Sequence, residues 1–461
     1  MIEFILNETD ISTDLPSGMT VLDFVRYHKD LKGTKIGCRE GDCGACTILV
    51  GELIDNEVRY RSMTSCLMPL ANAAGKHIVS VEGINPTDGS LTPVQQAMVD
   101  ESGTQCGFCT VGFVMSLTGF CIDRSDKTRE MAVSAIDGNI CRCTGYKSIE
   151  RAACRVSEQL AVSSEQFVPD YFGSIAGRLS GIITLDRSPL TAHRSLVVSG
   201  GTDLYVQRHD EMAESAATPL LYNDDLRGIH DTGEHIEIGG SATVTDLLES
   251  PVMNGIFPDL YKHLKLVSST PIRNMATLAG NFINASPIGD MTVWFLALDA
   301  EIDLTPGTQA SRLQTLALKD LYQGYKRIAK QPDEIVTKIR FKKPTTDFHF
   351  NFEKVCKRTY LDIATVNTAI SLQSEPPAVA GGLTRISNAH VSAGGVAPIP
   401  LYLKETSAFL TGKDVSEATI TVANEIMQAE VSPISDVRGT EQYKRLLLRQ
   451  LFRAHFVEMF N

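Results

Sequence analysis

Cysteine residues crowd into the amino-terminal third of this chain, and their placement limits what the chain can fold into. Ten of the eleven cysteines lie within the first 154 residues, and only Cys356 follows. Three of them fall within nine residues of the stretch GCREGDCGACT, which runs from 37 to 47. An odd number of cysteines, placed in tight loops of a chain expected to be cytoplasmic, argues against structural disulfides and favours metal binding.

The first cysteine group has the spacing of a [2Fe-2S] site. Cys38, Cys43 and Cys46 follow the pattern C-x4-C-x2-C, and Cys66 comes after nineteen further residues. This is the plant-type ferredoxin spacing, and the glycines in the loop permit the backbone angles needed to wrap a small inorganic core. Zinc also takes four thiolates, but its ligands usually come as C-x2-C pairs. The spacing therefore predicts an iron–sulfur cluster in preference to zinc.

The second group consists of Cys106 and Cys109 in QCGFC, and Cys141 and Cys143 in CRC, with 31 residues between the two pairs. Both pairs lie next to predicted helix starts, so the four thiolates could meet where two helices begin. Helix amino termini carry positive partial charge and unpaired N–H groups, which favour thiolates. This spacing alone does not separate an iron–sulfur cluster from zinc.

The three remaining cysteines lie outside both groups. Cys121 and Cys154 fall on apolar faces of predicted helices, and Cys356 lies far from either group. We interpret all three as small buried hydrophobic residues, the ordinary role of a free cysteine in a core.

Length and charge exclude several classes of protein. A chain of 461 residues is too long for one hydrophobic core, so we expect about three or four domains. The net charge of −12 argues against binding to nucleic acid, which needs a basic face. There is no apolar run of membrane-spanning length, no polybasic stretch and no signal-peptide pattern at the start. We therefore expect a cytoplasmic protein with no nucleic-acid or membrane partner.

The pattern of apolar residues changes along the chain. A short helix at 20–29, two strand-like runs around a turn within 47–62 and a further strand-like run at 77–84 predict a compact α+β domain over 1–85. Thr92 and Pro93 then give a strong helix start, and four helical segments predict a helical domain over 86–160. The later predicted segments are a linker at 161–180, alternating strands and helices at 181–345, and antiparallel strands with a helical tail at 346–461.

Two segments of the middle region could bind a dinucleotide. In LVVSGGTDLYV, at 196–206, a strand-like run reaches Gly200, Gly201 and Thr202, whose amides could approach a diphosphate. This is not the G-x-G-x-x-G pattern, and a Gly-Gly turn is common, so the signal alone is weak. The second segment, 270–291, is rich in Asn, Ser, Thr and Gly. The alternative interpretation of this segment is a polar surface turn.

The motifs GCREGDCGACT, QCGFCT and GNICRCTGY together resemble the paired iron–sulfur domains of the molybdenum hydroxylases, the xanthine dehydrogenase and aldehyde oxidase family. This resemblance implies that each cysteine group holds one [2Fe-2S] cluster, the first nearer the flavin and the second nearer molybdenum. It also implies that Gln105 lies close to a molybdenum cofactor. Val111 stands where the family usually has proline, at a position that is not a ligand.

The middle region resembles the FAD domain of the same family. Tyr325 would lie near the flavin ring, where nicotinamide stacks, and the loop to Asp362 would flank the flavin. Ala279 replaces a usual glycine, so its turn must avoid angles open only to glycine. The residues that this resemblance implies as FAD contacts are Val197, Val198, Ser199, Gly200, Gly201, Thr202, Asp203, Leu204, Thr277, Leu278, Ala279, Gly280, Asn281, Asn284, Ser286, Asp290 and Lys354.

The resemblance covers essentially the whole chain and implies its architecture. The expected fold is multidomain α+β. It comprises a β-grasp plant-type ferredoxin domain, a four-helix [2Fe-2S] domain, an FAD domain of the non-Rossmann, vanillyl-alcohol-oxidase-like type, and a carboxy-terminal antiparallel sheet with helices. The order of the motifs is most similar to the small subunits of bacterial xanthine dehydrogenases.

The implied activity is an electron relay. A molybdopterin-binding large subunit would oxidise xanthine or hypoxanthine, and electrons would pass through two [2Fe-2S] clusters to FAD and on to NAD⁺. The family implies two small and two large subunits, with no catalytic residue for hydroxylation on this chain. The alternatives are the equivalent subunit of an aldehyde, nicotinate or other N-heterocycle hydroxylase, a stand-alone iron–sulfur flavoprotein reductase, and a zinc-binding interaction module.

Overall fold

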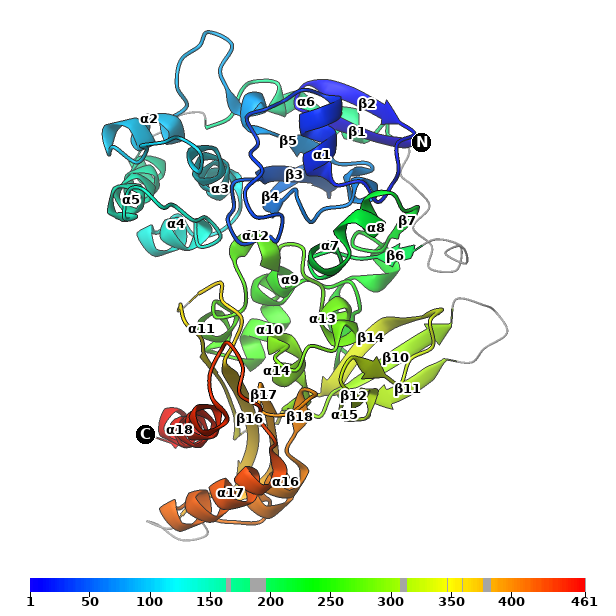
Figure 1. The fold of residues 1–461 in the computed structure, drawn as a ribbon, viewed down its shortest axis with the longest axis vertical. Helices are drawn as coiled ribbons and strands as arrows, with labels where there is room; N and C mark the ends of the chain where they lie inside the picture. The colour runs from blue at the N-terminus through cyan, green and yellow to red at the C-terminus, as the bar shows by residue number, and fades with distance from the viewer. Residues whose placement is uncertain are drawn as a thin grey trace. The chain divides into compact units, whose positions relative to one another are not determined.

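The computed structural model describes residues 1–162, 167–182, 196–306, 313–345, 347–358, 360–375 and 383–460. These residues form two compact units (Figure 1). Unit 1 comprises Met1–Asn223 together with Ser269–Ala276, and unit 2 comprises Asp224–Ser268 and Thr277–Asn461. Among the described helices, none combines the length and the apolar composition needed to cross a membrane.

Unit 1 begins with a five-stranded sheet of order β2-β1-β5-β3-β4. β1 and β5 run parallel, and the other neighbouring strands run antiparallel. A helical turn, α1 (Val21–Asp23), begins at the cap Thr20 and continues as a π-helix over Phe24–His28. This is the predicted β-grasp arrangement. The strands are β1 (Ile2–Leu6), β2 (Thr9–Thr13), β3 (Thr47–Ile54), β4 (Glu57–Thr64) and β5 (His77–Val79).

One strand is shorter than the sequence predicts. The run 77–84 was expected to be extended throughout, but β5 ends at Val79, and Val81–Ile84 form a 3-10 turn. A second 3-10 turn covers Leu70–Ala73. The first of these turns is half buried and the second is wholly buried, so contacts with the rest of the unit help to decide their conformation.

Four helices follow, as predicted. They are α2 (Pro93–Asp100), α3 (Thr110–Ile122), α4 (Arg129–Ala135) and α5 (Lys147–Val162). The Thr92 side chain accepts from Gln95 N and Pro93 occupies the first helical position, which explains where α2 begins. α3 is buried almost all round and lies at the centre of a second hydrophobic core.

The segment predicted as the linker 161–180 contains a helix that the sequence does not predict, α6 (Phe172–Leu179). Ile175 and Leu179 pack against Ile5 of the first sheet. Two glycines lower the intrinsic helix propensity of this segment, so the helix depends on this packing. Residues 163–166 lie outside the described part of the chain.

The rest of unit 1 carries the predicted glycine loop. The short strands β6 (Leu196–Val198) and β7 (Ala217–Pro219) pair in parallel. Helices α7 (Leu204–Gln207) and α8 (His209–Ala213) lie between them in the chain. The short helix α12 (Thr270–Arg273) also belongs to unit 1, although its sequence neighbours belong to unit 2.

Unit 2 contains a wholly antiparallel sheet of order β11-β10-β14-β9-β8. An antiparallel sheet agrees with the predicted non-Rossmann class, since Rossmann sheets are mostly parallel. Its strands are β8 (Ile229–Asp231), β9 (His235–Gly239), β10 (Glu301–Pro306), β11 (Gln314–Ala317) and β14 (Glu334–Lys342). The accompanying elements are a 3-10 turn (Asp224–Leu226), α9 (Val244–Glu249), α10 (Pro251–Ile256), α11 (Leu260–Leu264), α13 (Leu278–Asn284), α14 (Asp290–Leu296), α15 (Leu318–Leu321), β12 (Tyr322–Gly324) and β13 (Arg327–Ile328).

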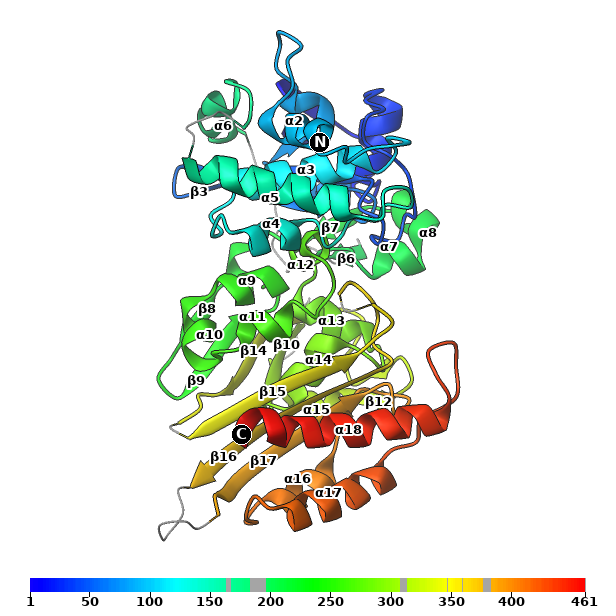
Figure 2. The ribbon, with the colours of Figure 1, turned by 90° about the vertical axis from the view of Figure 1, so that its left-hand side faces the viewer.

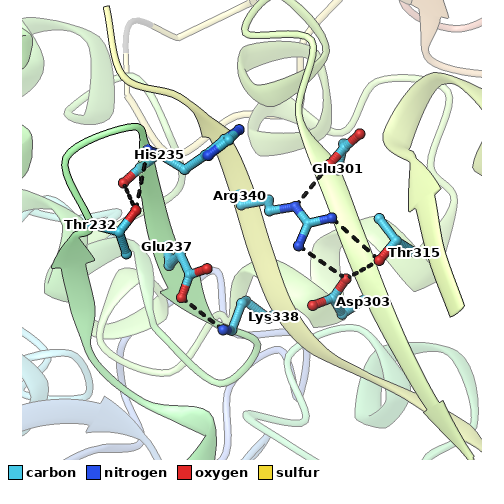
Figure 3. A network of polar contacts seen from close by, with 8 residues as sticks. All are labelled: Thr232, His235, Glu237, Glu301, Asp303, Thr315, Lys338 and Arg340. Atoms are coloured by element: carbon cyan, nitrogen blue, oxygen red, sulfur yellow. Dashed lines mark hydrogen bonds and ion pairs between the residues drawn. The ribbon is translucent and has the colours of Figure 1, made fainter. Parts of the chain in front are cut away.

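One face of this sheet carries a polar network instead of a core (Figure 3). Arg340 on β14 lies directly opposite Glu301 on β10, and its Nε donates to the Glu301 carboxylate at 2.8 Å. Lys338 donates to Glu237 of β9 at 2.7 Å. All four side chains are partly exposed, so this face is polar while the alternate residues of the strands face the core.

The carboxy-terminal part of unit 2 is a four-stranded antiparallel sheet in the order β15-β16-β17-β18. Helix α18 lies along one face of this sheet, and it crosses in front of the strands in Figure 2. His455 of α18 is fully buried, and its two ring nitrogens contact Asn351 and Thr368 of the sheet. The elements are β15 (Phe348–Val355), β16 (Val366–Glu375), β17 (Arg385–Gly394), β18 (Leu401–Tyr402), α16 (Lys404–Leu410), α17 (Glu417–Glu430) and α18 (Glu441–Phe460).

Candidate cofactor sites

The β3–β4 hairpin brings part of the first cysteine group together. Thr47 pairs with Thr64 at the open end of the hairpin, so Cys46 and Cys66 lie just beyond it. The Ser65 hydroxyl donates to Cys46 O at 2.7 Å and fixes this end. Cys46 and Cys66 are only 2% and 1% exposed. The hairpin register therefore places these two thiols side by side inside the first core.

The loop before β3 supplies the other two thiols of this group. Backbone amides of Glu40 and Cys43 donate to Cys38 Sγ at 3.3 and 3.4 Å. The hydrogen bond from the Cys43 thiol, together with these amides, lowers the pKa of Cys38 to about 5. A hydrogen bond from Cys66 likewise lowers the pKa of Cys46. Amides directed at sulfur favour the thiolate, the form that ligates iron.

The second cysteine group lies at the start of α3 and in the loop before α5, as the sequence predicts. Cys109 is the cap residue of α3. The sulfur atoms of Cys106 and Cys143 are 3.5 Å apart, and both residues are exposed. The Thr144 amide and hydroxyl contact Cys141 Sγ at 3.5 and 3.2 Å. Cys109 and Cys141 form the second contacting pair, and burial raises the pKa of Cys109 to about 12.

Each group therefore consists of two contacting thiol pairs. Within the described residues, no three Cys, His, Asp or Glu side chains converge on a position for a single metal ion. A [2Fe-2S] cluster takes two thiolates on each of its irons, so four thiols arranged as two pairs fit this cofactor.

Direct contacts join the loops of the two groups. Ile140 N donates to Cys43 O at 3.0 Å, and Ile140 immediately precedes Cys141. The Asn139 amide donates to Gly44 O at 3.2 Å and accepts from Ser116 at 2.7 Å. A side chain at Gly44, where φ is +67°, would lie 2.3 Å from Asn139 Nδ2. The close approach of these loops therefore depends on Gly44.

The predicted diphosphate loop lies beside the first cysteine group within unit 1. A Cβ atom at Gly201, where φ is +80°, would lie 2.5 Å from Leu67 O, next to Cys66. A Cβ atom at Gly200 would lie 1.8 Å from Met275 O. Asn72 donates to Ser199 O at 2.8 Å, but Ser199 Oγ and Asn72 Oδ1 are buried with no hydrogen-bond partner among the described residues. Crowded glycines and unpaired buried polar atoms fit a loop that binds a polar ligand.

The remaining predicted FAD contacts belong to unit 2. Thr277 caps α13, and its hydroxyl accepts from Gly280 N at 3.3 Å. Ala279 lies within this helix and has ordinary helical backbone angles. The alanine that replaces a usual glycine is therefore accommodated without strain. Asn281 Oδ1 accepts from both the amide and the hydroxyl of Thr292 at 3.0 Å. The predicted polar segment at 270–291 therefore contains two short helices, α12 and α13. Two of its polar side chains, those of Thr277 and Asn281, make hydrogen bonds that stabilise helix ends.

Asp290 and Lys354, both predicted FAD contacts, form a buried ion pair. Lys354 Nζ donates to Asp290 Oδ2 at 2.7 Å and to Leu266 O at 2.8 Å. Asn367 Nδ2 donates to the other carboxylate oxygen at 2.6 Å. The Lys354 side chain is 1% exposed, so it is not a solvated surface lysine. Lysine has three N–H donors, and contacts with the described residues use two of them.

The last predicted flavin neighbours are more exposed. Tyr325 is 65% exposed, and the next residue, Lys326, donates to the backbone and side-chain oxygens of Asn284 at 2.6 and 2.8 Å. This contact brings the Tyr325 turn to the end of α13. The carboxylate of Asp362 pairs with Arg358, whose amide also donates to it at 2.8 Å. Ser286 Oγ accepts from Ile288 N at 3.4 Å.

Some residues of these sites were not found from the sequence. Asn139 stands inside the quoted motif GNICRCTGY, yet only the structure shows that it bridges two cofactor loops. Met275 and Ile272 pack against glycines of two predicted cofactor loops, although the chain places them in the polar segment at 270–291. Asn72 carried no sequence signal.

Profiles of known domain families match the chain in the predicted order. A 2Fe-2S iron-sulfur cluster binding domain matches residues 4–71, and a [2Fe-2S] binding domain matches 80–154. An FAD binding domain in molybdopterin dehydrogenase matches 179–344, and a CO dehydrogenase flavoprotein C-terminal domain matches 352–459. The chain therefore has two [2Fe-2S] domains and an FAD-binding domain.

Known proteins are similar over most of the chain. Xanthine dehydrogenase 1 of Arabidopsis thaliana is 26% identical across 98% of this chain, and xanthine dehydrogenase of Emericella nidulans is 29% identical across 90%. The chain spans only 39% and 35% of those two relatives. A solved structure of CO dehydrogenase from Oligotropha carboxidovorans is 27% identical, with a TM-score of 0.51 over 56% of this chain and 87% of that chain.

Proposed function

The chain belongs to the iron–sulfur and flavin proteins of the molybdenum hydroxylase family, and from this premise we propose that it is the electron-transfer subunit of a xanthine dehydrogenase. Electrons would enter at the second cysteine group, pass to the first group and reach FAD, which would reduce NAD⁺. The clusters supply one-electron steps and the flavin supplies the two-electron step that a hydride acceptor requires. A partner subunit with molybdopterin would oxidise the substrate.

The observation that carries this proposal is a series of direct contacts within unit 1. The exposed Cys106–Cys143 pair belongs to the same quartet as Cys141, which follows Ile140. Ile140 donates to Cys43 O, and the Leu67 carbonyl beside Cys66 lies against Gly201. Each proposed cofactor-binding loop therefore contacts the next one, which is the order that a relay requires. Neighbouring loops in contact shorten the path that an electron must cross.

The residues of this chain would bind and orient the cofactors. The eight cysteines named above would ligate the irons, and the glycine loop at 199–202 would receive the diphosphate of FAD. The Asp290–Lys354 pair and Thr277–Asn281 would contact the rest of FAD, and Tyr325 would shield the site of nicotinamide. The proposal also includes the domain boundaries near residues 85, 160, 180 and 345, which separate the two iron–sulfur domains, the linker and the two parts of the flavin region.

The partner would cover the exposed side of the second group. Phe108, between Cys106 and Cys109, is 46% exposed, and Gln105 is also exposed. Exposed aromatic and cysteine side chains around a redox centre are a natural contact surface for a partner. A complex of two such chains with two molybdopterin subunits is the assembly that we propose.

A second candidate is the same relay serving another substrate. The similarity to CO dehydrogenase from Oligotropha carboxidovorans favours this alternative, because that relative is named for a different substrate. The relay residues of this chain would be the same in either case.

Co-purification from the native source tests the proposal. The tagged chain should bring down a molybdopterin subunit, and the complex should reduce NAD⁺ when xanthine is added. Reduction with another substrate but not with xanthine would favour the second candidate. Cys43→Ser should remove about half of the iron, since each [2Fe-2S] cluster has two irons, and should stop electron flow with FAD still bound. Absence of any molybdopterin subunit, or full iron content in this variant, would contradict the proposal.

A further inference from the structure

Residues 269–276, which we call the inserted segment, leave the flavin-domain sequence and pack within unit 1. Ser268 and Thr277 on either side belong to unit 2, whereas Ser269–Ala276 belong to unit 1. The segment contains α12 and packs against β4, the strand that ends shortly before Cys66. Its position in the sequence did not predict this location.

A buried ion pair anchors the inserted segment. Arg273 Nη2 lies 2.7 Å from Asp137 Oδ2, and the two side chains are only 4% and 5% exposed. Thr270 N donates to the other oxygen of Asp137 at 2.7 Å, and Arg273 also donates to the Thr270 hydroxyl at 2.7 Å. Asp137 lies four residues before Cys141. This buried ion pair holds the inserted segment in one geometry. Separation of the two side chains would leave each charge buried without its partner, which is strongly destabilising.

The inserted segment also contacts the loop of the first cysteine group. A Cβ atom at Gly41, where φ is +81°, would lie 2.7 Å from Ile272 Cδ1. The amides of Glu40 and Cys43, on either side of Gly41, donate to Cys38 Sγ at 3.3 and 3.4 Å. Ile272 therefore packs against the middle of a loop whose amides are directed at a proposed cluster ligand. Hydrogen bonds to sulfur tune the potential of an iron–sulfur cluster.

A third contact joins the inserted segment to the glycine loop. Met275 O lies so close to Gly200 that a Cβ atom added to this glycine would be 1.8 Å from it. Asn274 Nδ2 donates to Ser62 O at 2.8 Å, and Thr64 Oγ1 contacts Met275 Sδ at 3.5 Å. Ser62 and Thr64 lie on β4, so these contacts hold Met275 between β4 and the glycine loop.

We propose that the inserted segment is a positioning element that fixes the first-cluster loop relative to the glycine loop and so sets the rate of electron transfer between the first cluster and FAD. This inference rests on the proposed function. Each transfer moves one electron, and two transfers with proton uptake complete the reduction of the flavin. Ile272 acts by packing against Gly41 in the loop of the first cysteine group, and the Asp137–Arg273 pair acts by holding the segment in place. None of these side chains needs to touch a cofactor.

Two variants test the inference at separate points. Ile272→Ala removes the packing against Gly41 without touching a charge, and Asp137→Asn removes one charge of the anchor while keeping the size of the side chain. Arg129→Gln is the matched control, because it breaks an exposed Arg–carboxylate pair with Glu158 in the same unit. Iron and flavin contents and thermal unfolding are measured first, so that the comparison uses loaded, folded protein.

Electron transfer is then followed in the isolated chain. Illumination with EDTA under anaerobic conditions photoreduces the flavin, and the first cluster is followed by its electron paramagnetic resonance signal. We expect Ile272→Ala and Asp137→Asn to slow the transfer on the order of tenfold, since small misplacements of reacting groups have effects of this size or larger. In Ile272→Ala the potential of the first cluster should become more negative, with the second unchanged, because a weakened N–H···S bond disfavours the reduced state.

The outcomes separate this inference from the proposed function. Unchanged potential and rate in Ile272→Ala would overturn the positioning role, while transfer in the unaltered chain would leave the relay intact. If Asp137→Asn does not fold, Ile272→Ala alone decides. Slower electron transfer in Arg129→Gln would also overturn the positioning role, because the loss of any charged side chain would then be enough to slow the transfer. Absence of transfer in the unaltered chain would contradict the relay and this inference together.

Discussion

The two cysteine groups have the same number of thiols but differ in how deeply those thiols are buried. In the first group, Cys46 and Cys66 are part of a hydrophobic core, and Cys38 and Cys43 in the preceding loop are half-buried. In the second group, Cys106 and Cys143 are exposed, and Phe108 between the ligands is 46% exposed. The first group has no exposed thiol, whereas two of the four thiols in the second group are exposed.

This difference matches the two positions in a relay. An internal cluster exchanges electrons with cofactors of its own chain, so its surroundings can be fixed by the fold. A terminal cluster must exchange electrons with another molecule, so part of its surroundings has to be supplied by that molecule. The exposed thiols of the second group are therefore the part of the chain on which a partner should have the largest effect.

Replacement of one cysteine in each group should give the largest effects and should show the difference in burial between the two groups. Cys46→Ser and Cys143→Ser should each remove one cluster and about half of the iron. Cys46→Ser should also lower the free energy of unfolding by about 1–3 kcal/mol beyond the loss of the cluster, because it buries a hydroxyl in a hydrophobic core. Cys143→Ser should add no such cost, since Cys143 is exposed. Iron analysis and denaturant unfolding measure both effects, and equal costs of unfolding would contradict the contrast.

Acidification should affect the first region before the second. Burial lowers the pKa of His77 on β5 to about 4, while its ordinary value is 6.5. Below pH 6.5 the unfolded chain binds a proton that the folded chain does not, so the free energy of unfolding falls as the pH drops from 6.5 to 4. The total loss is on the order of 3 kcal/mol, at 1.36 kcal/mol for each pKa unit.

No histidine occurs between 78 and 192, so the helical domain lacks this source of acid sensitivity. The visible signal of the first cluster should therefore disappear at a higher pH than that of the second. His77→Gln should flatten the pH profile, since glutamine can contact Tyr60 and Asn7 without titrating. Loss of the second cluster first would contradict this expectation.

Alanine substitution at Gly44 and at Gly107 should give the smallest difference between the two groups. These two substitutions are also the most closely matched pair. Gly44 has φ of +67° and Gly107 has φ of +79°, so both substitutions bear a backbone cost of about 1–2 kcal/mol. A Cβ atom at Gly44 would also collide with Asn139, whereas one at Gly107 would have no atom within 4 Å. Gly44→Ala should cost about 1–3 kcal/mol more. Thermal unfolding measures the difference, and equal costs would mean that the two loops are not in close contact.

Local patterns predicted much of this molecule. The x4 and x2 spacing identified the first cysteine group, and the Thr92–Pro93 pair marked the start of α2. The β3–β4 hairpin and the carboxy-terminal antiparallel strands also followed from local pattern. These features were predictable because the residues that decide them are near neighbours in the sequence.

Features that depend on distant contacts were not predictable. Thr270 and Asp137 are 133 residues apart in the chain, and nothing in either segment indicates that they meet. Helix α6 depends on packing against the first sheet, and Lys354 is buried only because Asp290 is there to pair with it. The spacing of Cys106 and Cys143 likewise did not indicate that both would be exposed.

The order of the relay is tested most directly by photoreduction of the flavin in a chain without the first cluster. In the unaltered chain, illumination with EDTA should reduce the flavin and then both clusters, which electron paramagnetic resonance distinguishes. In Cys46→Ser, the flavin should be photoreduced while the second cluster stays oxidised, although dithionite should still reduce it. Reduction of the second cluster at the unaltered rate in Cys46→Ser would contradict the series of flavin, first cluster and second cluster.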